Sequence, residues 1–115
     1  SELLSAYGDS LYQEKLFGLS AKYYKEALNI EPQRFEAQVK YGMALYSDKK
    51  YPFALEVFME LINNEKFTKS VKTEKYVLLH RIIADCYRKI HMELESFKHI
   101  KIADSIEINY KNKQN

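Results

Sequence analysis

The stretch that decides the fold runs from Ala6 to Pro32 and reads AYGDSLYQEKLFGLSAKYYKEALNIEP. Apolar and aromatic side chains recur in it at spacings of three and four residues, which is typical of amphipathic helices. The pattern is interrupted between Lys15 and Gly18. It stops at Pro32, because proline cannot continue the hydrogen bonds of a helix. The stretch therefore predicts two helices joined by a turn.

The same pattern recurs later in the chain. One shift of the sequence along itself places Tyr7 and Gly8 on Tyr41 and Gly42, and a second, longer shift places Gly42 on Ala84. Internal similarity at such a period indicates a repeat protein. We expect one domain over residues 1–110, made of copies at 1–34, 35–68 and 77–110, an insertion at 69–76 and a polar tail at 111–115.

This arrangement resembles the tetratricopeptide repeat (TPR), a helix-turn-helix unit of about 34 residues. The residues that carry the resemblance are Leu4, Tyr7, Gly8, Leu11, Ser20, Tyr24, Ala27 and Pro32 in the first copy, Tyr41, Gly42, Leu45, Ala54, Phe58 and Leu61 in the second, and Ala84, Tyr87, Ser96, Ile100 and Ala103 in the third. The resemblance implies an all-α, right-handed α-solenoid of three repeats with about six helices. It also implies packing positions for Tyr7, Tyr24, Tyr41, Tyr51 and Tyr87. The small residues Gly8, Ser20 and Ala27 are predicted where the two helices of a pair cross closely.

Composition limits the class of protein. The chain is 46% hydrophobic and 30% charged, which fits a folded domain, and it has only 3 glycines and 2 prolines, which disfavours a sheet with many tight turns. No apolar run or secretory signal predicts a membrane span or export. The single cysteine, Cys86, excludes an internal disulfide, so we expect an intracellular protein of the cytoplasm or nucleus. Because the chain begins at Ser1, we expect a fragment of a longer protein.

We find no sequence pattern of an active site, a cofactor site or a metal site. The histidines are His80, His91 and His99. They lack the spacing of metal ligands on one helix, so we interpret them as surface or partly buried side chains, with His91 in a turn. Cys86 is interpreted as a small semi-buried filler. We therefore expect no enzyme and no cofactor; a regulatory domain of an enzyme whose catalytic part lies elsewhere stays an alternative.

The resemblance also implies a concave groove lined by the first helix of each pair. Its projected lining is Ser5, Asp9, Tyr12 and Gln13, then Val39, Met43, Tyr46 and Ser47, then Leu78, Arg81, Asp85, Arg88 and Lys89. We expect partner contacts at Asp9, Tyr12, Gln13, Met43, Tyr46, Arg81, Arg88 and Lys89. An aromatic and apolar floor with a cationic far end suits a peptide with an apolar anchor and an acidic flank. The alternatives are a solvated inner surface and a groove filled by the rest of a longer chain.

One peptide class is not expected to bind. Repeats that hold the acidic C-terminal tail of heat-shock chaperones use lysine and asparagine where this chain has Ser5, Asp9, Val39 and Met43. Asp9 would repel a carboxylate. We therefore predict no binding of a peptide that ends in Glu-Glu-Val-Asp.

The charge distribution leaves a second class of function open, which is nucleic-acid binding. Residues 1–65 carry 7 basic and 10 acidic side chains, whereas residues 66–115 carry 11 and 6, so the net charges are −3 and +5. This asymmetry suggests an oriented partner. An RNA-binding repeat that uses Lys69, Lys72, Lys75, Arg81, Arg88 and Lys89 is the alternative. The basic residues are too sparse for a strong nucleic-acid binder, so we expect a protein partner.

The last predicted helix carries apolar residues on more than one face. They include Phe97, Ile100, Ile102 and Ile106. Terminal repeats normally need a polar outer face, so we expect this surface to be covered by a further repeat, a partner subunit or a second copy. The stretches 7–28 and 73–90 also resemble the N-terminal region of TPR subunits of the anaphase-promoting complex, a cell-cycle ubiquitin ligase. That resemblance implies a self-associating scaffold subunit.

Overall fold

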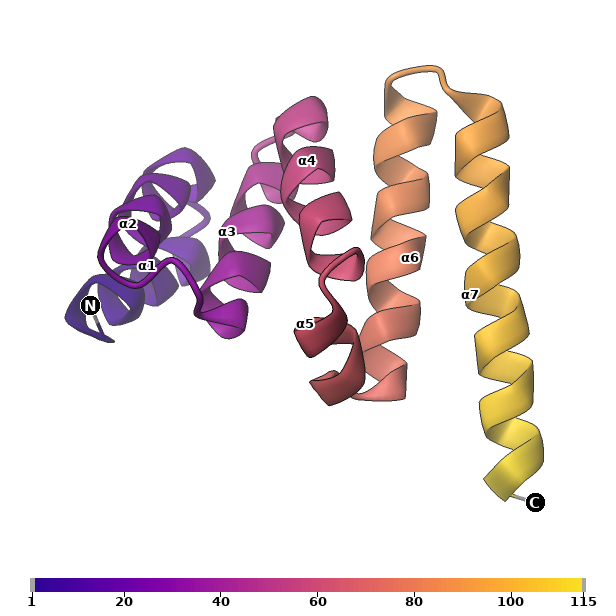
Figure 1. The fold of residues 1–115 in the computed structure, drawn as a ribbon. Coiled ribbons are helices and arrows are strands. Elements are labelled where there is room, and N and C mark those ends of the chain that lie inside the picture. Colours follow the sequence, from indigo (N-terminus) through magenta and orange to yellow (C-terminus); the bar gives the residue numbers. More distant parts are fainter. Residues whose placement is uncertain (1, 115) are drawn as a thin grey trace. The chain divides into compact units, whose positions relative to one another are not determined.

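The computed structural model describes residues 2–114, which form seven helices and no strand (Figure 1). The helices are α1 (Glu2–Gln13), α2 (Phe17–Ile30), α3 (Phe35–Ser47), α4 (Tyr51–Ile62), α5 (Glu65–Ser70), α6 (Thr73–Lys89) and α7 (Glu93–Gln114). The all-α prediction is confirmed. The helix number is one more than the six expected, because α5 forms within the segment between the second and third pairs.

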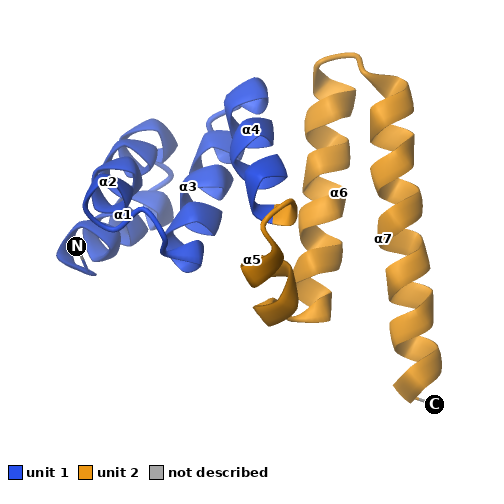
Figure 2. Cartoon of the chain, in the orientation of Figure 1, with its two compact units in different colours: residues 1–61 blue, residues 62–115 orange. Residues whose placement is uncertain are grey.

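The chain divides into two compact units (Figure 2). Unit 1 is Ser1–Leu61 and contains α1, α2, α3 and most of α4, whereas unit 2 is Ile62–Asn115 and contains α5, α6 and α7. Within unit 1, α2 packs on both α1 and α3, and within unit 2, α6 packs along α7. The contacts thus form two compact units where the sequence predicts one domain, and the single domain stays a prediction.

In unit 1, small residues lie where the two helices of a pair approach. A Cβ atom added to Gly8 would come within 2.7 Å of the Tyr24 ring, and one added to Gly42 would come within 2.7 Å of the Phe58 ring. The buried Ser20 hydroxyl donates a hydrogen bond of 2.7 Å to the Gly8 carbonyl oxygen. The predicted crossing of the first pair at Gly8 and Ser20 is confirmed.

Three of the interhelical turns share one backbone motif. Lys15, Lys49 and His91 each adopt a positive φ, of 64°, 62° and 66°. In each turn, the next residue donates its N–H to a carbonyl five residues earlier: Leu16 to Leu11 at 2.9 Å, Lys50 to Leu45 at 2.9 Å and Met92 to Tyr87 at 2.8 Å. This pattern is the Schellman motif, which satisfies carbonyl groups at a helix end. The steps from Lys15 to Lys49 and from Lys49 to His91 equal the two shifts that align the sequence copies.

The segment before α6 differs from the expected insertion at 69–76. The Asn64 side chain accepts a hydrogen bond from the Phe67 N–H and so caps α5, while Phe67 itself is buried. An asparagine at this position satisfies a backbone donor that the helix leaves open. The insertion is therefore partly helical, and α6 already begins at Thr73.

Most of the predicted polar tail is helical. Residues 111–114 continue α7, and residue 115 lies outside the described part of the chain. The Tyr110 hydroxyl donates a hydrogen bond of 3.1 Å to Glu74 of α6. This contact joins the C-terminal turns of α7 to α6, so the helix does not end at the boundary drawn from the sequence.

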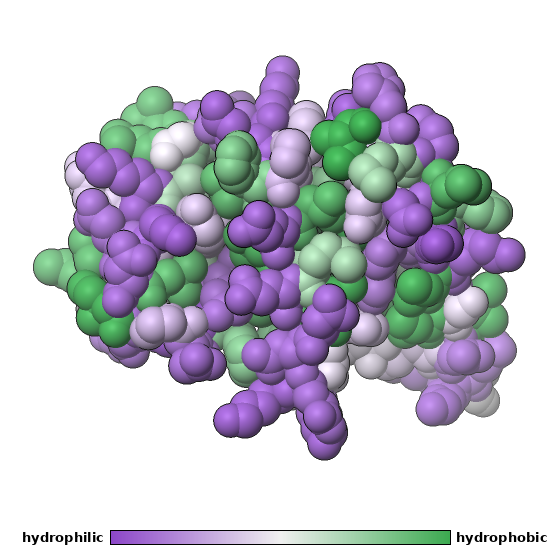
Figure 3. Space-filling model, turned by 45° about the horizontal axis from the view of Figure 1, so that its top comes forward, coloured by the Kyte–Doolittle hydropathy of each residue, from purple (hydrophilic) through white to green (hydrophobic). Residues whose placement is uncertain are grey.

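One predicted core residue is on the surface. Tyr7 is 51% exposed, and its ring packs edge-on against the Tyr23 ring, with the centroids 4.7 Å apart. Its counterpart Tyr41 packs against the buried Ala21 and Tyr24 of the preceding pair. The described residues contain no helix pair before α1, which explains the difference. Figure 3 shows other hydrophobic side chains that reach one face of the molecule among hydrophilic ones.

Candidate functional site

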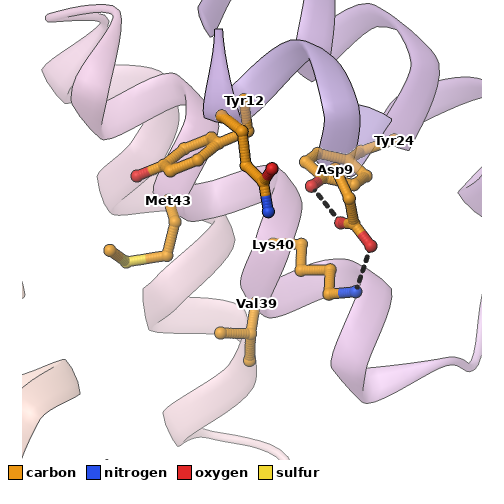
Figure 4. A pocket seen from close by; sticks show the side chains of 7 residues that line it. Asp9, Tyr12, Tyr24, Val39, Lys40 and Met43 are labelled. Carbon is orange, nitrogen blue, oxygen red and sulfur yellow. Dashed lines mark hydrogen bonds and ion pairs between the residues drawn. The ribbon is translucent and has the colours of Figure 1, made fainter. Parts of the chain in front are cut away.

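A hollow of about 410 Å³ lies in unit 1 against α1 and α3 (Figure 4). Its lining is Asp9, Tyr12 and Gln13 from α1, Tyr24 from α2, and Val39, Lys40 and Met43 from α3. Residues three and four apart share one face of a helix, which is why the α1 residues lie together. Positions 9 and 43 are equivalent in the two sequence copies, so both pairs contribute the same face of their first helix.

The structure brings together five of the residues projected onto the groove. Asp9, Tyr12, Gln13, Val39 and Met43 all line the α1–α3 hollow. Sequence reasoning missed two further lining residues, Tyr24 and Lys40. The signal for Lys40 was its position three residues before Met43, which places the two side chains on one face of α3.

Asp9 is at the centre of a polar network at one end of the hollow (Figure 4). Its Oδ1 accepts a hydrogen bond from the Tyr24 hydroxyl, and its Oδ2 lies 3.1 Å from the Lys40 Nζ. Lys40 also pairs with Glu36 at 3.3 Å. The Asp9 carboxylate was expected to repel acidic ligands. Because it is paired with the Lys40 cation, its repulsion of an acidic ligand is weaker than that of an unpaired carboxylate.

The protonation of this network follows from burial and from its partners. Burial, and then the hydrogen bond to Asp9, raise the pKa of Tyr24 well above its usual range, so the phenol stays neutral. Burial lowers the pKa of Lys40, but its hydrogen bonds to Asp9 and Glu36 outweigh this effect and raise the pKa overall. Lys40 therefore remains a cation, and Tyr24 remains a hydrogen-bond donor.

Tyr12 forms a fixed wall of the hollow. Its hydroxyl group lies 2.8 Å from the Ser47 Oγ, and its ring packs edge-on against Phe17 with centroids 4.9 Å apart. Tyr46 was expected in the same groove but does not line this hollow. Its ring lies 5.9 Å from that of Tyr51, at the turn between α3 and α4.

The projected cationic residues lie in unit 2, where acidic side chains pair with two of them. Arg81 of α6 bonds to Asp104 at 3.1 Å and to Glu107 at 2.7 Å on α7. The hydrogen bond to Asp104, together with the contact with Glu107, raises the pKa of Arg81 despite partial burial. Arg88 bonds to Asp85 at 2.6 Å. Arg81 therefore links α6 to α7, and Arg88 pairs within α6, so these arginines do not form a purely cationic surface.

The histidines and the cysteine have distinct positions. His80 and His99 are 3% and 8% exposed, and their Nδ1 atoms lie 2.9 Å apart, so the interpretation as surface or partly buried side chains is wrong. The two rings belong to the packed faces of α6 and α7. His91 lies in the turn between these helices, as predicted.

Cys86 is fully buried, which raises the pKa of its thiol to about 12 and confirms that it fills space in the core.

Most of the residues assigned to an oligomer surface are exposed on α7. Phe97 is 58% exposed, Ile102 is 40% exposed and Ile100 is 38% exposed, whereas Ile106 is half-buried and does not belong to an open face. Ile108, which also belongs to the apolar set predicted for this helix, is 58% exposed, and Leu94, which the sequence reasoning left out, is 78% exposed. The exposed apolar surface of α7 therefore includes Leu94 in addition to most of the predicted residues.

Residues 2–114 contain no candidate for a membrane span or for a metal-binding cluster. None of the helices formed by these residues has the length and apolar character needed to cross a membrane. Within the same range, no three histidine, cysteine, aspartate or glutamate side chains gather in a way that could hold a metal ion.

Comparison with known proteins identifies the fold. No protein-family model matches the sequence, and no curated protein sequence matches it significantly. A solved structure of MamA from AMB-1 superposes on 94% of this chain with a TM-score of 0.78 and 18% sequence identity. The match covers 59% of the MamA chain, so this chain spans about three fifths of that length. MamA is a TPR protein, and the chain has the TPR-like helical repeat fold that its sequence predicts.

Proposed function

We propose that the chain is a protein-interaction scaffold that binds a peptide of a partner protein in the α1–α3 hollow. The observation that carries this proposal is the convergence of equivalent positions from two helix pairs on one open, mainly apolar hollow. Helical walls are preorganised, so binding orders the peptide more than the protein. An apolar hollow with few polar groups is the usual form of a ligand site.

The lining indicates an apolar anchor in the peptide. Val39 and Met43 supply aliphatic surface, and the flexible thioether of methionine adapts to different side chains. Tyr12 supplies a rigid aromatic wall. The exposed Gln13 amide offers both donors and an acceptor for a peptide backbone. Because Asp9 and Lys40 neutralise each other, affinity depends mainly on apolar burial and less on the peptide's net charge.

The test selects peptides from a random library displayed on phage against the wild-type chain. Binding of the selected peptides is then measured by fluorescence polarisation to the wild type and to Met43→Glu. We expect Met43→Glu to weaken binding at least tenfold, because a carboxylate would be buried against an apolar anchor. The matched control is Phe53→Glu, which changes an exposed apolar residue of unit 1 outside the hollow.

Two outcomes would contradict the proposal. One is that no peptide is enriched on the wild type. The other is that the enriched peptides bind Met43→Glu and Phe53→Glu equally well. Circular dichroism of both variants establishes that each retains its helices before binding is compared.

A second candidate function, self-association, is favoured by the exposed surface of α7. Leu94, Phe97 and Ile108 are separated by three and eleven residues, close to one and three helical turns, so they share one side of the helix. α1 also exposes apolar residues, with Leu3 at 86% and Tyr7 at 51%. Unit 1 carries 7 basic and 9 acidic residues, and unit 2 carries 11 and 7, which favours contact between unlike units of two copies.

Light scattering over a range of protein concentrations tests self-association. We expect the wild-type mass to rise above 13.6 kDa with concentration and to fall when salt is added. Phe97→Glu should keep the chain monomeric, whereas Phe53→Glu should behave as the wild type does. A wild-type chain that stays monomeric at all concentrations would contradict this second function and leave peptide binding to be judged separately.

A further inference from the structure

Two buried histidines join α6 and α7. His80 of α6 and His99 of α7 are stacked, with ring centroids 5.1 Å apart and an interplanar angle of 23°. Their Nδ1 atoms are 2.9 Å apart, which is a hydrogen-bond distance. Tyr76 packs edge-on against His80, at 4.7 Å, and Tyr87 stacks on His99, at 5.6 Å. The pair is therefore enclosed by aromatic rings from α6.

Only one proton fits between the two Nδ1 atoms. One ring must donate its Nδ1–H, and the other must accept with its Nδ1 lone pair. The Nε2 of His80 is buried and has no hydrogen-bond partner within residues 2–114. A bare lone pair is easier to leave unpaired than an N–H group. We assign His80 as the Nδ1 donor and His99 as the Nδ1 acceptor, from the available partners.

A second proton destabilises the pair wherever it is added. On the Nε2 of His80, it creates a buried imidazolium with an unpaired N–H. On the Nδ1 of His99, it places two N–H donors against each other at 2.9 Å. Both arrangements leave a charge or a donor without a partner in a buried site. The packed state of α6 and α7 therefore requires two neutral rings.

We propose that the His80–His99 pair is an acid-sensitive latch: it holds α6 against α7 when both rings are neutral, and it releases the two helices when either ring is protonated. Release would loosen unit 2 in mildly acidic solution, because α6 and α7 form most of this unit. The latch operates independently of the peptide site in unit 1.

The surrounding charges and the direction of the pKa shifts support this assignment. Burial, and then the charge of His99, lower the pKa of His80 to about 4. Burial also lowers the pKa of His99, where nearby Glu95 opposes the shift and Lys98 adds to it. The unfolded chain therefore takes up protons at a higher pH than the folded chain. Stability is present above about pH 6.5 and is lost as the pH falls from there toward 4.

Nuclear magnetic resonance of the full chain tests the latch directly. The chain has only three histidines, so the ring signals of His80 and His99 can be followed separately, and the urea-unfolded chain serves as the reference. We expect the ring signals of His80 and His99 to titrate at lower pH in the folded chain than in the urea-unfolded chain. Hydrogen exchange should then show faster exchange in α6 and α7 at pH 5 than at pH 7, after correction for the intrinsic rates. Titration of His80 and His99 at the same pH in the folded and the unfolded chain would overturn the proposal.

Urea unfolding of a matched double variant provides the second test. His80→Leu/His99→Leu replaces both partners by apolar groups of similar size, a change that is often tolerated. Below pH 6, we expect the unfolding equilibrium constant of the wild type to rise roughly tenfold for each pH unit of acidification, beyond any rise in the double variant. This slope follows if the unfolded chain binds one proton more than the folded chain. His91→Gln should retain the wild-type response. An identical pH dependence of unfolding in the wild type and the double variant would overturn the proposed latch. If the double variant does not fold, the magnetic resonance titration of the wild type decides whether the proposal holds.

Discussion

At the residue scale, the absence of two Cβ atoms sets how closely the paired helices approach. The Tyr24 ring occupies the space beside Gly8, and the fully buried Phe58 ring occupies the equivalent space beside Gly42. The same residue thus has the same packing role in both copies of unit 1. In the third copy an alanine, Ala84, takes this position and is itself buried.

Gly42→Ala should destabilise the chain. Alanine gains about 1 kcal/mol over glycine within a helix, but a methyl group 2.7 Å from the Phe58 ring overpacks the core, at a cost of about 1–3 kcal/mol. We expect a net loss of about 1 kcal/mol in urea unfolding followed by circular dichroism. The control is Gly18→Ala, whose new methyl group would face the Asp48 carboxylate at 3.2 Å, a side chain that can rotate into solvent. Equal or greater stability of Gly42→Ala relative to the wild type would contradict this account.

The sequence allowed some of these residue roles to be predicted and not others. Gly8 recurs as Gly42 in the second copy, and Ser20 and Tyr24 align there with the small Ala54 and the aromatic Phe58, so their packing could be predicted from the repeat. The His80–His99 pair could not, because it depends on how α6 lies along α7, which no repeat specifies. A signal was nevertheless present, since His80 and His99 each lie four residues before a buried alanine, at Ala84 and Ala103.

At the element scale, the interhelical turns share a costly backbone conformation. Lys15, Lys49 and His91 occupy the left-handed region, which side chains with a Cβ adopt at a cost of roughly 1 kcal/mol and which glycine adopts freely. None of these turns has the glycine that normally favours a Schellman motif. The turns were predicted from breaks in the apolar pattern, but their conformation was not, because no glycine marked it.

Lys15→Gly should stabilise the chain by about 0.5–1 kcal/mol in thermal or urea unfolding, because it relieves the backbone strain. Lys49→Gly should do the same at the next turn. Lys22→Gly, an exposed substitution inside α2, is the control and should destabilise by about 1 kcal/mol. A loss of stability in Lys15→Gly similar to that in the control would show that the left-handed conformation is not strained.

At the scale of the whole molecule, the two compact units are expected to open separately. Helical repeats contact mainly their neighbours, so stability is distributed along the chain and is not shared equally. The helix pattern predicted the repeat fold that the MamA superposition confirms. The division after Leu61 was not predicted, because it depends on how contacts are distributed between pairs and not on the pattern within each pair.

Cys86 reports on the opening of unit 2. It is the only cysteine and is fully buried, so a thiol reagent can reach it only after this unit opens. Ile83→Ala removes a fully buried side chain next to it in unit 2, at a cost of about 2–4 kcal/mol. We expect labelling of Cys86 to accelerate at least tenfold in Ile83→Ala and to remain within about twofold of the wild-type rate in Gly42→Ala.

The control for this experiment is the labelling rate in denaturant, which should be the same in all three chains. If Gly42→Ala accelerates labelling as strongly as Ile83→Ala does, the two units open as one cooperative body. In that case the two units defined by their contacts do not unfold independently.

The short helix α5 has a consequence for how such a chain can change during evolution. Within each pair, the Schellman turn fixes the length of the connection, so an inserted residue would break its two hydrogen bonds. More residues separate the Lys49 turn from the His91 turn than separate the Lys15 turn from the Lys49 turn. The extra residues belong to the segment that contains α5, which Asn64 caps. Insertions and deletions should therefore be tolerated at the junctions between helix pairs and selected against inside the pairs. Related chains should then differ in the number of residues between pairs, while the length of each helix pair stays the same.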